Sequence, residues 1–485
     1  MEGTGGGAGA QAASRGIFTA KKGYTLSLWV REKPFYRMFF SLTLIIGLQN
    51  LITFGVNLSD NLMVGGYSEA SLSGVALANQ IQFLLQMLVM GVCEGVVILS
   101  ARAWGAKNIG TVKQAAAIGL WISVLLSAVL LGAVFFFPHA SLAIFTGDQA
   151  VIAEGERYLR IICFSYLFFA VTNILLAALR SVETVKVGFI VSLSTLMINV
   201  CLNYILIYGK FGFPELGIRG SAIATLAARI IETVIVVLYL KRFDLKISLR
   251  FRELLTINGQ LFKQYLSIGS PVLMSNTLWG VAMAAQTVIL GHMGAEAIAA
   301  NSIATTIFQI VTVITYASAS ATAVLIGKTI GQGRIERVKP YAKTLQLLYL
   351  GIGICTALVL YAGKGYLLQF YSISEGSREL ALHFMTVLSV TVIGTAYQMP
   401  ALTGIVRSGG DTRFVLYNDT FFMWLIVLPS AALSAFVWNL SPYVVFICLK
   451  SDQILKSFVA LVKVNRFRWI RSFDTPVSAQ SADGA

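Results

Sequence analysis

An acidic residue, Asp60, stands near the end of the first long apolar stretch of the sequence, within VNLSDNLMVG at residues 56–65. An ionisable group inside a membrane-spanning segment is energetically costly, so such a group faces a partner or a cavity and marks an ion pathway. If the stretch is helical, the nearby polar residues share one face with Asp60, within an arc of about 100°. These residues are Asn50, Thr53, Asn57 and Asn61. The alternative is a helix that ends near Asp60, with the carboxylate in the headgroup region.

Residues 187–209 carry a second polar face that can complement this carboxylate. On a helix, four of its polar residues fall within an arc of about 80°. They are Ser192, Thr195, Asn199 and Asn203. The next segment, GIRGSAIAT at 217–225, is rich in small residues that allow close helix contact. Hard cations bind carboxylate, amide and hydroxyl oxygens, which predicts a cation site here, with Na⁺ as the candidate metal. Its expected ligands are Asp60, Asn199, Asn203 and Thr225. The alternative is that the amides only hold the helices together.

Two further charged features are interpreted as intramembrane. Glu94 is either a second proton site or the partner of a basic residue such as Arg102 or Arg180, and the structural role is favoured. Arg229 and Glu232 are three residues apart, so they are expected to form a structural ion pair on one helix face.

Six polar, aromatic or methionine residues of the second half form a candidate lining for an organic substrate. They are Asn276, Trp279, Met283, Gln286, Asn301 and Gln398. Such side chains suit a flat lipophilic cation through cation–π interactions and adaptable apolar contacts. Pro400 interrupts the helix that contains Gln398 and can free a backbone carbonyl. Ordinary helix packing is the alternative for each residue.

Several other chemistries are not expected. The five cysteines lie inside apolar stretches without ligand or disulfide spacing, so they are interpreted as packing residues. The sequence has no phosphate-binding loop of the Walker type, which argues against ATP hydrolysis, and no cofactor or enzymatic activity is predicted. The net charge of +15 is concentrated in loops and tails, which indicates membrane topology rather than binding of nucleic acid.

The elements that must position these residues are membrane-spanning helices. The chain of 485 residues is 56% hydrophobic and only 12% charged, with a mean hydropathy of +0.76. Its apolar runs approach the roughly 20 residues that a spanning helix needs. Twelve helices are predicted, at 38–62, 72–100, 114–137, 155–180, 187–209, 219–240, 265–291, 297–326, 341–363, 379–406, 413–437 and 441–462. Basic residues fall in every second loop and in both tails, which places both termini in the cytoplasm.

The sequence also repeats itself. LSARAWGAKNIGTVK at 99–113 resembles LIGKTIGQGRIERVK at 325–339, with a constant offset of 226 positions, and Arg180-Ser181 recurs as Arg407-Ser408 at an offset of 227. Each half then holds six helices, which predicts two similar bundles with a substrate path between them. Because the acids Asp60 and Glu94 correspond to Gln286 and Ser320, the first half is expected to handle the ion.

The expected fold class is therefore an all-α membrane protein with twelve transmembrane helices, in two pseudo-symmetric six-helix bundles around a V-shaped central cavity. The expected domains are a cytoplasmic tail, an N-lobe, a cytoplasmic linker, a C-lobe and a second cytoplasmic tail. Their bounds are 1–36, 37–240, 241–264, 265–462 and 463–485.

Taken together, these motifs make the chain similar to the multidrug and toxic compound extrusion (MATE) transporters. The resemblance covers about residues 35–462 and rests on the order and spacing of five segments. These are VNLSDNLMVG, LSARAWGAKN, RSVETVK, GIRGSAIAT and RSGGDT. It implies two six-helix lobes and export of lipophilic cations coupled to inward flow of Na⁺ or H⁺.

The resemblance also implies where the coupling ion binds. The family's N-lobe site matches Asp60, Asn199 and Thr225, but Asn203 stands where the family has a second acid, which removes a charge from a Na⁺ site. One branch of the family has acids on helices 7 and 10, where this chain has Trp279 and Ala396, so a C-lobe cation site of that type is not expected.

The resulting hypothesis is a monomeric secondary transporter in the plasma membrane, the inner membrane if the cell is bacterial, that exports small organic cations in exchange for H⁺ or Na⁺. Excluding water around Asp60 favours its neutral form, so ion binding and substrate binding compete for one conformation. The alternatives are a lipid-linked oligosaccharide flippase of the same superfamily, or a channel or non-transporting scaffold. A flippase would need a strongly cationic cavity, whereas Arg229 is interpreted as the only mid-membrane cation.

Overall fold

The computed structural model describes residues 30–369 and 373–471 of the chain. The tails predicted at 1–36 and 463–485 therefore fall largely outside the described residues. Within the described ranges the regular structure is entirely helical. This is expected for a chain in a bilayer, where the backbone finds no water and a helix satisfies its own N–H and C=O groups.

Eight helices form the first half of the chain, which we call the first bundle. They are α1 (Lys33–Gly65), α2 (Glu69–Gly105), α3 (Ile109–Phe136), α4 (Pro138–Ala143), α5 (Gln149–Ile162), α6 (Ser165–Ser181), α7 (Lys186–Tyr208) and α8 (Ile218–Arg242). A short 3₁₀ turn, η1 (Phe251–Leu254), lies in the loop that leads to the second half.

The second half, which we call the second bundle, has longer and more irregular helices. Its elements are α9 (Gly259–Gly291), α10 (Ala295–Gly331), α11 (Ile335–Leu368), α12 (Glu375–Met399), η2 (Pro400–Val406), α13 (Thr412–Thr420), η3 (Phe421–Val427), α14 (Leu428–Ala432), η4 (Leu433–Val437) and α15 (Pro442–Asn465). The segments η2, η3 and η4 are π-helical and continue the helices beside them.

These elements are consistent with the twelve helices that the sequence predicts. Within the described ranges, ten helices are long and apolar enough to cross a membrane, and α5 with α6 forms an eleventh candidate that bends by 52°. The twelfth predicted helix corresponds to α15, a helix of 24 residues that contains Lys450, Asp452 and Lys456 and packs against α12. The protein is therefore a multi-pass membrane protein.

Two predicted helices are interrupted in the structure. The helix predicted over 155–180 is divided into α5 and α6, because the chain bends between them. At the bend the amides of Phe164 and Tyr166 bond to carbonyls three residues back, which is the tighter 3₁₀ pattern. The helix predicted over 379–406 changes to π-helix at Pro400, whose ring nitrogen cannot donate the next helical hydrogen bond.

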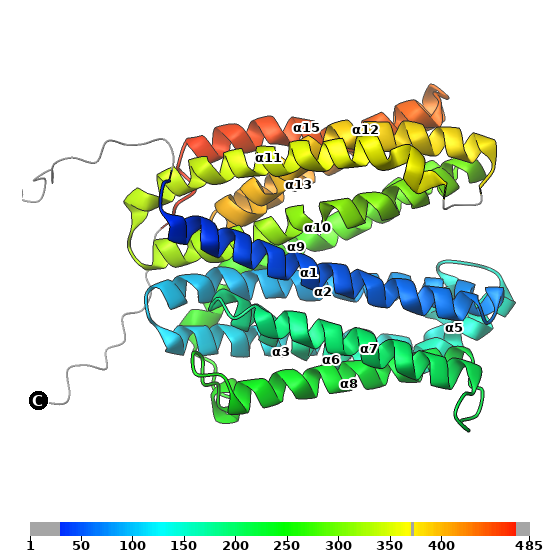
Figure 1. Ribbon diagram of the computed structural model, residues 1–485, viewed down its shortest axis with the longest axis horizontal. Coiled ribbons are helices and arrows are strands. Elements are labelled where there is room, and N and C mark those ends of the chain that lie inside the picture. Colours follow the sequence, from blue (N-terminus) through cyan, green and yellow to red (C-terminus); the bar gives the residue numbers. More distant parts are fainter. Residues whose placement is uncertain (1–29, 370–372, 472–485) are drawn as a thin grey trace, which may run out of the picture.

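The two bundles lie side by side, with α1–α8 below and α9–α15 above in Figure 1. Across the interface α2 packs against α9, α1 against α10, and α2 against α10. Two of these contacts are related by the sequence repeat. A Cβ built at Gly91 would lie 2.7 Å from Cα of Leu273, and one built at Gly47 would lie 3.7 Å from Cβ of Ala317. Because Gly47 and Gly91 precede Leu273 and Ala317 by 226 positions each, the structure has the predicted pseudo-symmetry.

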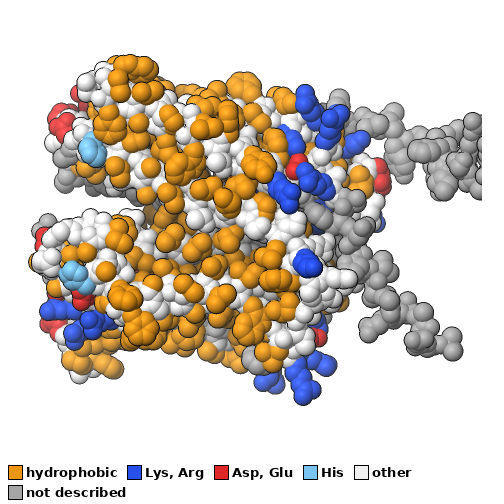
Figure 2. Space-filling model, turned by 180° about the vertical axis from the view of Figure 1, so that it is seen from behind, with side chains coloured by type: hydrophobic (Ala, Val, Ile, Leu, Met, Phe, Trp, Pro, Cys, Tyr) orange, Lys and Arg blue, Asp and Glu red, His pale blue; other side chains and the backbone are white. Residues whose placement is uncertain are grey.

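The two ends of the molecule differ in charge and in shape. Lys and Arg side chains gather at one end, near the loops after α2, α8 and α10, and we call this the basic end. Figure 2 shows the surface hollowed between the two bundles at the opposite end. Beneath the basic end, a buried cluster that includes Phe39, Val324 and Tyr349 joins α1 to α10 and α11, so the bundles are closed there.

Candidate functional site

The structure brings the four predicted cation ligands together between α1, α7 and α8. Asp60 is only 8% exposed. Its Oδ1 accepts a hydrogen bond of 2.5 Å from Asn203 Nδ2, and its Oδ2 accepts one of 3.5 Å from Thr225 Oγ1. The carboxylate is therefore buried inside the first bundle and bonded to helix α7, rather than exposed at the surface of the protein.

A second layer of hydrogen bonds holds these ligands in place. Asn199 Nδ2 donates to Thr225 Oγ1 at 3.2 Å, and Asn203 Nδ2 also donates to Asn199 Oδ1 at 3.1 Å. Both asparagines are fully buried. Within the described part of the chain, Asn203 Oδ1 has no hydrogen-bond partner. A buried acceptor without a donor is unfavourable, so a small cation beside Asp60 and Asn203 would satisfy an oxygen that the protein leaves unpaired.

Glycines bring α7 and α8 close enough for the hydrogen bonds between Asn199, Asn203 and Thr225. A Cβ at Gly220 would lie 2.4 Å from the carbonyl oxygen of Leu206, so α8 starts directly against the end of α7. Gly217, just before α8, has φ +53, a left-handed conformation that glycine adopts without a Cβ penalty. The close contact predicted from GIRGSAIAT is thus confirmed, and it places Thr225 beside Asn199.

A cavity of about 10 Å³ adjoins the carboxylate. Its walls come from α1, α2, α5 and α8, and the lining residues are Val56, Asn57, Asp60, Asn79, Gln82, Tyr158, Thr225 and Arg229. This volume holds about one water molecule or one small ion. The cavity therefore fits a coupling ion and is far too small for an organic substrate, whose pockets measure roughly 300–1,000 Å³.

Sequence reasoning missed three residues of this lining. Asn79 and Gln82 are amides three positions apart inside the apolar α2, a spacing that places both on one helix face and could have been noticed. Tyr158 lies on the short α5, which was predicted as part of a longer helix, and nothing in its sequence neighbourhood points to Asp60.

The charge nearest to the site is a guanidinium that already has a partner. Arg229 lines the same cavity as Asp60, and its Nη1 forms an ion pair of 2.8 Å with Glu232 Oε2. The predicted structural pair Arg229–Glu232 is therefore confirmed. Asp60 itself accepts hydrogen bonds from the neutral side chains of Asn203 and Thr225. Among the described residues, no cluster of three or more His, Cys, Asp and Glu is placed to hold a metal.

The rest of the polar face on α1 divides between the cavity and its surroundings. Asn57 lines the cavity, whereas Asn50 and Asn61 are half-buried and are not among the lining residues. Glu94 lies elsewhere, on α2, where it forms an ion pair with Arg407 Nη1 across the interface between the bundles. The sequence suggested a basic partner such as Arg102 or Arg180 for Glu94. The ion-pair partner in the structure is Arg407, from the other half of the chain.

Arg407 begins a chain of buried charges within the second bundle. Its Nη2 donates a hydrogen bond of 3.0 Å to the hydroxyl of Ser275 and lies 3.7 Å from Asp419 Oδ2. Lys456 Nζ then joins Asp419 at 3.2 Å and Asp452 at 3.1 Å. The expectation that the intramembrane acids belong to the first half alone is therefore wrong. That expectation came from the repeat counterparts of Asp60 and Glu94 alone. It left out Asp419 on α13 and Asp452 on α15.

The charged residues of α15 also correct the predicted number of cations inside the membrane-spanning helices. Arg229 is not the only mid-membrane cation, because Lys450 and Lys456 lie inside α15 rather than in a basic tail. Lys456 is held by the two aspartates, and Lys450 Nζ donates to Gln286 Oε1 at 3.4 Å. Lys456 is buried and Lys450 is half-buried, and each ammonium group contacts an acceptor, as is typical of charges within a membrane protein.

The candidate substrate residues of the second half occupy several environments. Gln286 is buried, and its Nε2 lies 3.3 Å from the sulfur of Met423. Trp279 is 37% exposed, and Met283 packs against the buried core of the second bundle. The amides of the set, Asn276, Asn301 and Gln398, are all half-buried. The role of these six residues in lining a substrate path stays a prediction.

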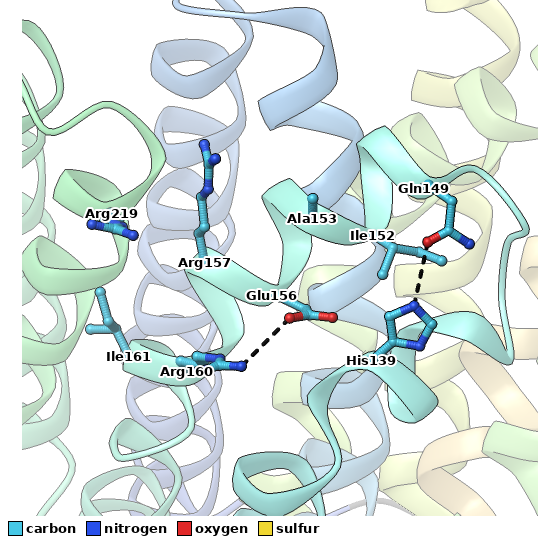
Figure 3. A pocket seen from close by; sticks show the side chains of 9 residues that line it. All are labelled: His139, Gln149, Ile152, Ala153, Glu156, Arg157, Arg160, Ile161 and Arg219. Carbon is cyan, nitrogen blue, oxygen red and sulfur yellow. Dashed lines mark hydrogen bonds and ion pairs between the residues drawn. The ribbon is translucent and has the colours of Figure 1, made fainter.

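A larger cavity, of about 500 Å³, lies on the surface beside α5. Figure 3 shows its lining, in which Arg160 forms an ion pair of 3.7 Å with Glu156 and His139 lies 3.4 Å from Gln149. Its arginine side chains, including Arg157 and Arg219, are exposed. The charged pairs are the solvated face of a short amphipathic helix, so this cavity is not part of the buried cation site.

Two pseudo-symmetric bundles of spanning helices, with a buried carboxylate in one of them, define a secondary transporter fold. The family model MatE matches residues 46–205 and 271–433, one match in each bundle, and the chain belongs to this family. A "Probable multidrug resistance protein NorM" of Listeria monocytogenes is 25% identical over 441 residues, which cover 91% of this chain and 96% of that protein.

Solved structures show the same fold. The crystal structure of a MATE protein in complex with MaL6 superposes with a TM-score of 0.81 at 18% identity, and covers 90% of this chain and 96% of its own. The bent form of the Vibrio cholerae MATE transporter VcmN matches with a TM-score of 0.80 at 18% identity, and covers 89% of this chain and 97% of its own.

Proposed function

We propose that this protein is a multidrug efflux transporter that exchanges H⁺ or Na⁺ for lipophilic, cationic small molecules by alternating access. The observation that supports this most is the single carboxylate of Asp60, buried between three helices, bonded to neutral donors and open to a cavity of ion size. Its relative in Listeria monocytogenes is named for multidrug resistance. No catalytic activity is part of the proposal.

In this mechanism Asp60 couples ion binding to helix packing. While it is charged, the carboxylate needs the hydrogen bonds from Asn203 and Thr225, so it ties α1 to α7 and α8. A proton or Na⁺ neutralises the carboxylate and weakens its hold on those donors. The first bundle can then adopt a second packing in which access changes sides. Because the cavity at Asp60 holds only an ion, the organic substrate binds in the hollow between the bundles.

The proposal includes the orientation and the domain bounds. Both termini and the basic end face the cytoplasm, in line with the positive-inside rule. The N-lobe spans 37–240, the cytoplasmic linker 241–264 and the C-lobe 265–462, with tails at 1–36 and 463–485. We further propose a monomer in the plasma membrane.

The charges of the second bundle argue against the flippase alternative. A flippase cavity would offer unpaired cations to an anionic lipid headgroup. Here Arg407 and Lys456 each contact carboxylates, and Lys450 contacts an amide oxygen. Such cations are occupied by the protein itself and leave little charge for an anionic substrate.

The test is Asp60→Asn, with Asp452→Asn as a control of matched burial in the second bundle. Purified variants in proteoliposomes are given an imposed H⁺ or Na⁺ gradient, and accumulation of a fluorescent organic cation is followed. We expect Asp60→Asn to lose gradient-driven transport while it keeps a cooperative thermal unfolding transition, because the amide cannot be neutralised by an ion. Asp452→Asn should retain coupling, since Lys456 keeps Asp419 as its partner. Full coupled transport by Asp60→Asn would reject the assignment.

A further inference from the structure

The last residues of α2 and α10 touch each other in a reciprocal contact at the basic end. A Cβ built at Gly331 would lie 1.9 Å from the carbonyl oxygen of Arg102, and a Cβ built at Gly105 would lie 2.2 Å from the carbonyl oxygen of Lys328. Distances this short mean that no side chain fits on either glycine while the helix ends are together. Each helix therefore places a carbonyl of its last turn against the bare backbone of the other.

The contact obeys the internal repeat. Gly331 follows Gly105 by 226 positions, and Lys328 follows Arg102 by the same number. The two helix ends thus meet on the pseudo-two-fold axis, one from each bundle. Neither Gly105 nor Gly331 has a positive φ, so an alanine would be tolerated by the backbone at both positions. The need for glycine arises from the opposite helix alone.

The side chains beside the glycines reach into the opposite bundle in the same reciprocal way. Arg102 of α2 donates from Nε and Nη2 to the carbonyl oxygen of Ser408, at 2.9 and 2.6 Å. Lys328 of α10 forms an ion pair with Glu183, which follows α6. Ser408 is the second residue of Arg407-Ser408, and Glu183 lies two residues after the repeat-related Arg180-Ser181. Each cation therefore fastens its helix end to the repeat-related helix end of the other bundle.

We propose that Gly105, Gly331 and these two cations form the gate that closes the transport path at the basic end, with Gly105 and Gly331 as positioning residues. The inference rests on the proposed transport function but not on Asp60 or on the identity of the ion. When the path opens to the basic end, the two helix ends must separate and both cations must leave their partners for water. The packed state shown here is the one closed at this end.

The first test places a methyl group in the contact. Gly105→Ala and Gly331→Ala are compared with Gly291→Ala, which changes the last residue of α9, where nothing lies within 4 Å of the added Cβ. Hydrogen–deuterium exchange reports on peptides that contain the ends of α2 and α10. We expect both gate variants to exchange there about tenfold faster than the wild type and to lose most of their transport, because the closed state is disfavoured. Gly291→Ala should match the wild type. Wild-type exchange and transport in both gate variants would overturn the proposal.

A second test covers the case in which a gate variant fails to fold. A Cβ at Gly327 would lie 2.9 Å from Cβ of Ala101, within about 1 Å of the separation that a disulfide needs. The double variant Ala101→Cys with Gly327→Cys should cross-link under oxidation, stop transport, and regain it with a reductant. The two single variants control for the native cysteines. Absence of the cross-link, or normal transport by cross-linked protein, would overturn the gate.

The two proposals fail separately. Cross-linking should proceed equally well with Asp60→Asn added, because the helix ends do not contact the ion site. If Asp60→Asn transports normally while the cross-link still stops transport, the gate stands and the ion assignment falls. If the cross-link forms without stopping transport, the gate falls whatever the result at Asp60.

Discussion

Replacing Asn203 by aspartate tests how the charge of the ion site sets its affinity for Na⁺. Asn203 Nδ2 lies 2.5 Å from Asp60 Oδ1, so Asn203→Asp puts two carboxylates in direct contact. Two unit charges about 4 Å apart repel by about 4 kcal/mol at an effective dielectric constant of about 20. A cation bound between them removes this repulsion. The gain corresponds to a factor of about 10³ in affinity at most. Because Arg229 also lines the cavity and protons compete, we expect an increase of about tenfold to a thousandfold.

The measurement is a titration of purified protein with NaCl, with choline chloride at equal ionic strength as the blank and the thermal unfolding midpoint as the signal. Work at about pH 8.5 limits competition by protons, since carboxylates of ordinary acidity are then ionised. Asn173→Asp is the matched control, because Asn173 Nδ2 donates to the carbonyl of Phe169 on its own helix α6, outside the ion site. The reasoning is refuted if Asn203→Asp binds Na⁺ no more tightly than the wild type, or if Asn173→Asp shows the same gain.

Two other predictions concern stability. Arg407→Met should lower the free energy of unfolding by about 2–3 kcal/mol in a denaturant titration, because it removes a cation from Glu94 and Asp419; the partial exposure of these acids moderates the loss. The control is Arg337→Met, which breaks a pair with side chains 43% and 47% exposed and should cost at most about 0.5 kcal/mol. Equal losses in the two variants would contradict the argument. Burial raises the pKa of Glu253, but the hydrogen bonds and charges of Arg250 and of its ion-pair partner Lys113 together lower the pKa below its ordinary value. This pair therefore stabilises the loop after α8 above the unfolded pKa of about 4.3 and is lost as the pH falls below it. Thermal unfolding between about pH 6 and pH 3 should show less acid destabilisation in Glu253→Gln.

The sequence predicted the bundles well because the bilayer leaves few alternatives. Apolar runs of spanning length must be helical, and the repeat of 226 positions then required two related halves. The helix ends extend beyond the predicted bounds by several residues, as at α10, which continues from 326 to Gly331. This extension includes the gate glycine, and its importance appears only when the end of α2 is placed against it.

The clustering of Asp60 with Asn203 was predictable for a similar reason, and the charges of the second bundle were not. Asp60 and Asn203 stand out as polar residues within apolar helices, and their spacing placed them on inward faces. Lys450 and Lys456 lie near the end of the chain, where basic residues are typical of a cytoplasmic tail. Lys450 contacts Gln286 and Lys456 contacts Asp419. Both partners are distant in sequence and come close through the packing of α15 against α9 and η3.

The repeat explains why the proposed ion site belongs to the first bundle even though both bundles contain buried acids. Arg229 corresponds to Lys456 and Thr225 to Asp452, each at an offset of 227 positions. In the second bundle Lys456 contacts Asp452 directly, at 3.1 Å. An ammonium group attached to the chain neutralises that acid permanently, so a diffusible ion gains little there.

In the first bundle the corresponding cation is turned away from the acid. Arg229 pairs with Glu232, and Asp60 is left with hydrogen bonds from uncharged groups. Gln286, which corresponds to Asp60 in the second bundle, is uncharged and already accepts a hydrogen bond from Lys450. A carboxylate stabilised only by neutral donors gains the most from a proton or Na⁺. Exchange of the coupling ion is therefore expected at Asp60, and movement of the second bundle must follow through the contacts between the bundles.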